Sequence, residues 1–101
     1  MHLIQILLPL ADNEGREFPE GTLRDIHADL AERFGGLTAY SRSPARGVWK
    51  SGPDEQKDDI VIVEVMAESL DETWWTDLRK RLETLLGQEE LVIRATEIRK
   101  L

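Results

Sequence analysis

The sequence predicts an α+β domain with a ferredoxin-like βαββαβ layout, and two observations lead to this expectation. Hydrophobic patterns along the 101 residues follow the order strand, helix, strand, strand, helix, strand. The longest run of β-branched apolar residues, Asp59 to Met66, falls in the middle of this order and is typical of a central strand. We therefore expect one domain over residues 1–101, with a four-stranded antiparallel sheet in the order 4-1-3-2 and two helices on one face.

The N-terminal part is expected to form the first strand and the first helix. Residues alternate in character from His2 to Leu8, and Pro9 should end this strand because proline cannot donate to a ladder. Asp12 to Gly15 has the composition of a turn. Apolar residues at helical spacing then predict a helix from Thr22 to Phe34.

The second strand is expected in two pieces. Leu37 to Arg42 forms the first piece, Pro44 interrupts it, and Gly47 to Lys50 continues it. Ser51 to Asp58 is polar and mostly acidic, which predicts a loop before the central strand.

The second helix should bury one apolar stripe. Its predicted members are Leu70, Trp74, Leu78, Leu82 and Leu85. Trp74 belongs to this stripe, whereas Trp75 falls on its flank. A last strand is expected from Glu90 to Ile98.

Short signals mark the ends of both helices. Thr22 with Asp25, and Ser69 with Glu72, have the spacing of capping boxes, so each helix should begin there. Gly35-Gly36 and Gly87 suit left-handed C-terminal caps.

The two faces of the sheet should differ in character. Val61, Val63 and Val65 point one way along the central strand and should pack against the helices. The other face combines apolar residues with a few polar ones, which are Gln5, Tyr40, Arg42, Glu64 and Arg94. Because an apolar sheet face of this size is costly in water, we expect a homodimer that pairs these open faces.

Glu64 is the candidate for catalysis because a carboxylate on an apolar face needs a partner. Arg42 or Tyr40 on the neighbouring strand is expected to be this partner, in preference to Arg94. One interpretation is a polar-lined pocket in which Glu64 acts as a base. The other is an internal ion pair that fixes the register of the dimer.

A second candidate region is the basic segment Arg42 to Lys50. Three of the 13 basic residues fall in these nine positions of a chain with net charge −7. Arg42 and Arg46, with Trp49 as an apolar anchor, could bind an anionic small molecule or an acidic protein partner. The alternative is a twisted hairpin arm whose charges protect an edge strand from aggregation.

Composition excludes several other classes of function. The net charge of −7 argues against nucleic acid and anionic membrane surfaces as partners. The absence of cysteine excludes thiolate chemistry and Cys-based metal sites, and His2 and His27 do not have the spacing of metal ligands. Since no targeting or membrane-spanning segment is apparent, we expect a cytoplasmic protein without metal or cofactor.

The pattern as a whole resembles small bacterial single-domain proteins of unassigned function. The resemblance rests on Phe34 to Thr38 at a helix end, the Gly-x-Trp strand at Gly47 to Trp49, and Leu86 to Glu89 closing the second helix. It implies no catalytic residue. The expected dimer is also similar in architecture to the dimeric α/β-barrel group, which includes cofactor-free monooxygenases and small-molecule binders.

These observations lead to two functional hypotheses. The first is a binding or interaction module that acts as a homodimer and has no catalytic activity. The alternative is a cofactor-free small-molecule enzyme, monooxygenase- or isomerase-like, with Glu64 as base and Tyr40 or Arg42 holding an anionic group.

Overall fold

The computed structural model describes the backbone of residues 1–39, 45–51 and 54–101, and the side chains of residues 1–39 and 60–101. The elements follow one another as β1 (His2–Pro9), α1 (Thr22–Phe34), β2 (Thr38–Ala39), β3 (Ala45–Ser51), β4 (Asp54–Ala67), α2 (Glu72–Leu85) and β5 (Ile93–Glu97). This confirms the α+β class and the βαββαβ layout, with the second predicted strand divided into β2 and β3.

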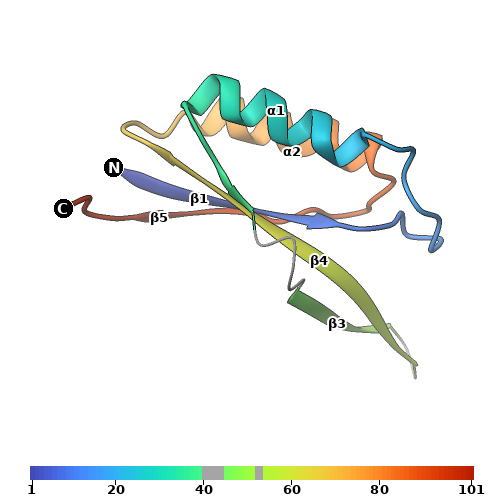
Figure 1. The fold of residues 1–101 in the computed structure, drawn as a ribbon. Coiled ribbons are helices and arrows are strands. Elements are labelled where there is room, and N and C mark those ends of the chain that lie inside the picture. The colour runs from blue at the N-terminus through green and yellow to red at the C-terminus, as the bar shows by residue number, and fades with distance from the viewer. Residues whose placement is uncertain (40–44, 52–53) are drawn as a thin grey trace.

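The strands form one antiparallel sheet in the order β2-β4-β1-β5, and β3 pairs with the other end of β4. When β2 and β3 are counted as one strand, this is the expected order 4-1-3-2 read in reverse. Both helices cover the same face of the sheet, and the opposite face carries no helix (Figure 1).

The core lies between the two central strands and the helices. Ile4 pairs with Val65, Ile6 with Val63 and Leu8 with Val61, and all six side chains are at most 4% exposed. They pack with Leu30 of α1 and with Trp75 and Leu82 of α2. The prediction that the three valines face the helices is therefore confirmed.

Strand β4 is longer than predicted, and the prediction of a loop over Ser51 to Asp58 is wrong for Ser51 and for residues 54–58. These residues pair with β3, from Ser51↔Asp54 to Ala45↔Ile60. The β3–β4 hairpin extends beyond the part of the sheet that the helices cover (Figure 1). In this hairpin, backbone hydrogen bonds hold the strands together and no helix packs on them. The sequence there does not need the alternating apolar residues by which a half-buried strand is recognised.

The bounds of α1 agree with the prediction, but both predicted capping boxes are wrong. The N-cap of α1 is Gly21, in a left-handed conformation with φ 86°, and Thr22 is already helical. The N-cap of α2 is Asp71, whose carboxylate accepts a 3.1 Å hydrogen bond from the Trp74 N–H, so this helix begins after Ser69. Aspartate caps as well as serine does, so Asp71, two residues after Ser69, can take this role.

The C-terminal glycine signals were correct. Gly35 has φ 73° and its N–H donates to the Ala31 carbonyl, and Gly87 has φ 59°. The turn after β1 is also confirmed, because Asp12 Oδ1 accepts from the N–H groups of Glu14 and Arg16, each at 2.9 Å.

The stripe that α2 buries agrees only in part with the predicted one, which correctly included Leu82. Trp75, Leu82 and Leu86 are at most 6% exposed, whereas Leu85 is 60% exposed. Trp74 is half-buried and meets Phe34 of α1 edge-on, with ring centroids 5.4 Å apart. The predicted stripe corresponds mainly to the side of α2 that faces α1, while the stripe through Trp75 faces the sheet.

The C-terminal strand is shorter than the predicted range Glu90 to Ile98. Strand β5 covers Ile93–Glu97, and Leu91 before it is buried in the core at 3% exposure. Neither helix of the described chain is long and apolar enough to cross a membrane.

Candidate functional site

The uncovered sheet face carries a row of polar residues. In the register of the sheet, Gln5 of β1 lies opposite Glu64 of β4 on one side and opposite Arg94 of β5 on the other. Thr38 of β2 lies opposite Glu64 and extends the row. Because residues in register point to the same face, these four side chains cross the sheet perpendicular to its strands. We call them the polar row.

Two hydrogen bonds connect three members of the polar row. Gln5 Nε2 donates to Glu64 Oε2 at 2.6 Å, and Arg94 Nε donates to Gln5 Oε1 at 2.7 Å. These contacts fix the orientation of the amide, because its NH₂ group can only donate and its carbonyl can only accept. Gln5 therefore links a guanidinium and a carboxylate that stand on the strands to either side of it.

Apolar residues bound the polar row along the strands. Leu3 lies opposite Met66 on one side of the row, and Leu7 lies opposite Ile62 on the other. Each apolar pair is two residues from the row, which corresponds to about 7 Å along a strand. Leu3, Leu7 and Ile62 are half-buried, and Met66 is 48% exposed. The face thus presents donors and an acceptor inside an apolar surround, which suits a ligand with a polar group and an apolar body.

The other predicted site residues lie outside the described side chains. These are Tyr40, Arg42, Arg46 and Trp49; the backbone of the last two belongs to β3. The expectation that Arg42 or Tyr40 contacts Glu64 therefore stays a prediction, as does an anionic ligand or acidic partner at Arg42–Lys50. The sequence predicted that Gln5 lies on this face, but it did not indicate that Gln5 is a partner of Glu64.

Both histidines have a ring nitrogen that is buried without a hydrogen-bond partner among the described residues. These atoms are His2 Nδ1 and His27 Nε2. Burial lowers the pKa of the His27 imidazole, because removal from water disfavours its charged form. Within residues 1–39 and 60–101, no three His, Asp or Glu side chains are grouped so that they could hold a metal ion.

One contact between the helices was missed at the sequence level. The guanidinium carbon of Arg33 lies 4.0 Å from the centroid of the Trp74 ring, which is a cation–π geometry. Arg33 lies in the last turn of α1 and Trp74 in the first turn of α2, so only the packing of the two helices brings them together. No local motif could have indicated this pair.

The fold and the polar row together define an α+β protein with an open, partly polar sheet face. Two solved structures are similar to it in fold. One is a phage SAM lyase in complex with S-methyl-5′-thioadenosine, with a TM-score of 0.65, 16% sequence identity, and coverage of 95% of this chain and 80% of that one. The other is a phage SAM lyase in the apo state, with a TM-score of 0.58, 17% identity, and coverage of 94% and 78%. A scan of protein-family models and a search of curated proteins gave no match.

Proposed function

We propose that the protein is a cytoplasmic small-molecule-binding module that acts as a homodimer, with its ligand held at the polar row between two open sheet faces. The observation that carries this proposal is the hydrogen-bonded series Arg94, Gln5 and Glu64 on the face that the helices leave uncovered. A structural ion pair would require only two of these side chains in contact. The longer row presents several hydrogen-bonding atoms toward the space in front of the sheet.

Pairing of two open faces is supported by their apolar content. Met66 and Val92 on this face are 48% and 39% exposed, and Leu3, Leu7 and Ile62 are half-buried. A second copy packed about a two-fold axis would remove these side chains from water. It would also enclose the polar row and create a site lined by both subunits.

The structural neighbour in complex with S-methyl-5′-thioadenosine suggests the ligand class to test first, a nucleoside thioether. The Glu64 carboxylate can accept from ribose hydroxyl groups or an amine, and Arg94 can donate to a ring nitrogen. Leu7 and Ile62 offer an apolar surface for the methylthio group.

Two measurements test the proposal. Light scattering should give a dimer for the wild type and a monomer for Ile62→Asp, which places a charge on the open face. Calorimetric titration with S-methyl-5′-thioadenosine should show binding that is weakened at least about tenfold in Glu64→Ala, as expected for a lost charge-assisted hydrogen bond. The matched control is Glu68→Ala, which removes the same side chain just after β4 and should leave binding unchanged.

A wild-type monomer with no heat of binding contradicts the proposal. If Ile62→Asp is still a dimer, the interface lies on a surface other than the open sheet face. If Glu64→Ala and Glu68→Ala bind the ligand equally well, the ligand does not bind at the polar row.

The neighbours also favour a second candidate function, a cofactor-free lyase that uses Glu64 as base. In such a reaction with SAM, a C–S bond breaks and its electron pair cancels the sulfonium charge. In the released fragment, the adjacent C–H bond breaks: its electron pair forms a C=C bond and its proton passes to the carboxylate, so no oxidant or reductant is needed. Incubation with SAM followed by chromatography should then yield S-methyl-5′-thioadenosine with the wild type and none with Glu64→Gln. Binding without product supports the module.

A further inference from the structure

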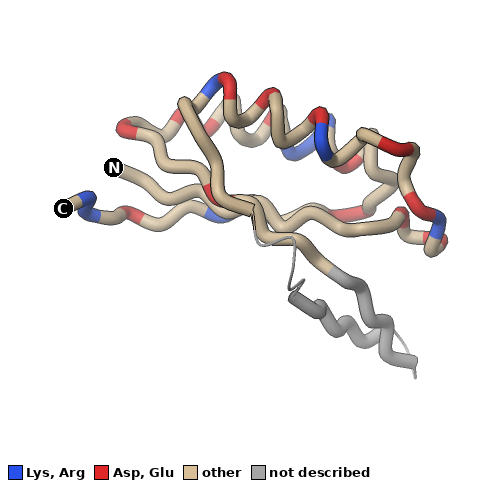
Figure 2. The backbone as a smooth tube through the Cα atoms, in the orientation of Figure 1, with Lys and Arg blue, Asp and Glu red and all other residues tan. Residues whose placement is uncertain are grey.

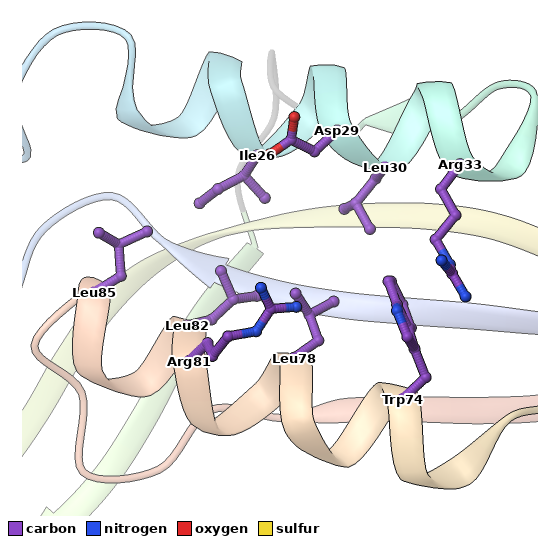
Figure 3. Close-up of a pocket in the computed structure, with 9 residues that line it drawn as sticks. All are labelled: Ile26, Asp29, Leu30, Arg33, Trp74, Leu78, Arg81, Leu82 and Leu85. Carbon is purple, nitrogen blue, oxygen red and sulfur yellow. The ribbon is translucent and has the colours of Figure 1, made fainter.

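A groove lies on the opposite side of the molecule from the polar row, between the two helices. Its volume is about 340 Å³, and Leu30 of α1 with Leu78 and Leu82 of α2 form its apolar floor. Figure 3 shows side chains from both helices pointing toward this groove, with Arg33 and Trp74 at one end and Leu85 at the other. A groove of this size is within the range of small-molecule sites.

Two arginines give this groove a local positive charge. Arg33 reaches into it from α1 and Arg81 from α2 (Figure 3). Elsewhere the helical layer carries many acidic positions (Figure 2), in agreement with the net charge of −7. Two guanidinium groups beside an apolar floor are therefore a local exception to the charge of the protein.

Neither arginine is neutralised by an ion pair within the described residues. The ion pairs found there belong to Arg16, Arg24 and Arg79, each with an acidic residue one to four positions away along the chain. Arg33 and Arg81 take part in none of them.

The position of Arg33 leaves its donors available. Its guanidinium carbon lies over the Trp74 ring, 4.0 Å from the ring centroid. The N–H bonds of a guanidinium lie in its plane and can still donate in pairs to a carboxylate. The Trp74 contact also limits the motion of the side chain, so less conformational entropy is lost when an anion binds.

Asp29 on the rim of the groove limits the charge that can bind. One carboxylate against two guanidinium groups leaves a net charge of +1 in the groove. This balance favours a singly charged anion over a phosphate-like dianion.

We propose that the groove between α1 and α2 binds a small amphipathic monoanion, namely a medium-chain aliphatic carboxylate. The carboxylate is held by Arg33 and Arg81, and the chain lies on the three leucines of the floor. From Trp74 to Leu85 the groove follows eleven residues of α2, which corresponds to about 16 Å at the helical rise. This site is separate from the polar row and does not depend on the function proposed for it.

The test is a titration of the full chain with decanoate, followed by amide chemical shifts and calorimetry. Shifts should appear on facing residues of α1 and α2. Octanoate should bind more weakly, by up to roughly fourfold for each methylene that is no longer buried. Decanol, which has the same chain without charge, should bind at least about tenfold more weakly than decanoate.

Matched variants identify the residues involved. Arg33→Gln and Arg81→Gln should each weaken decanoate binding by about tenfold. Arg99→Gln removes the same charge near the C-terminus and should have no effect, whereas Asp29→Asn should strengthen binding by a few-fold. Far-ultraviolet circular dichroism confirms that each variant is folded.

Three outcomes would overturn the proposal. They are equal affinity for decanol and decanoate, shifts confined to the open sheet face, and binding that depends on Arg99 as much as on Arg33 and Arg81.

Discussion

The hydrogen bond between Gln5 and Glu64 should be measurable as a coupling free energy. The contact is 2.6 Å long and joins a neutral amide to a carboxylate on a half-buried part of the sheet. Hydrogen bonds to charged groups contribute about 1.5–3 kcal/mol, and partial exposure to water reduces this one to about 1 kcal/mol. Since Gln5→Ala also removes the 2.7 Å bond from Arg94, we expect it to lower the free energy of unfolding by about 2 kcal/mol.

A double-mutant cycle separates the two contacts of Gln5. The variants Gln5→Ala, Glu64→Ala and their combination are unfolded in urea at one protein concentration, with tryptophan fluorescence as the signal. We expect a coupling of about 1 kcal/mol between Gln5 and Glu64. A control cycle of Gln5→Ala with Glu68→Ala should give a value near zero, because Glu68 lies four residues beyond Glu64. A coupling below about 0.3 kcal/mol in the first cycle would refute the reasoning.

Three further predictions follow from the helices. Asp71→Ala should destabilise the protein by about 1 kcal/mol because it removes the cap on the Trp74 N–H, whereas Ser69→Ala should have little effect in the same urea assay. Leu86→Ala should cost about 3 kcal/mol because this side chain is fully buried, while Leu85→Ala, at a position 60% exposed, should change the free energy of unfolding by less than about 0.5 kcal/mol. Because the pKa of His27 is lowered, the folded state binds a proton at this imidazole less readily than the unfolded state does. The free energy of unfolding therefore decreases as the pH falls from the unfolded pKa toward the folded pKa. Thermal unfolding of His27→Gln should therefore show a weaker decline below pH 6.5 than the wild type; parallel pH profiles would contradict this.

The faces of the sheet could be predicted from the sequence because they follow from alternation alone. Ile4, Ile6, Val63 and Val65 stand at positions two apart in their strands, and a strand has no other way to bury them together. The sequence could not show that Gln5 joins Glu64 to Arg94. That contact depends on the register of three strands that are far apart in the chain.

The errors on α2 also have a physical origin. This helix packs against both the sheet and α1, so it has two adjacent apolar stripes. The sequence analysis correctly included Leu82, but it chose Trp74 and Leu85 where the core contains Trp75 and Leu86. Periodicity identifies apolar sides of a helix but does not say which neighbour each side contacts.

The polar row also determines which alternative structures the sheet avoids. A slip of β4 by one residue would turn Glu64 under the helices, toward Leu30 and Trp75, and would turn Val63 and Val65 to the open face. A carboxylate in that environment is costly, and Gln5 would point away from it. An apolar residue in place of Glu64 would impose a much smaller penalty on the slipped pairing. Glu64 is the single charge in the apolar part of β4, residues 60–67, and it therefore selects one register. It does so in the isolated chain, before any ligand or second copy binds.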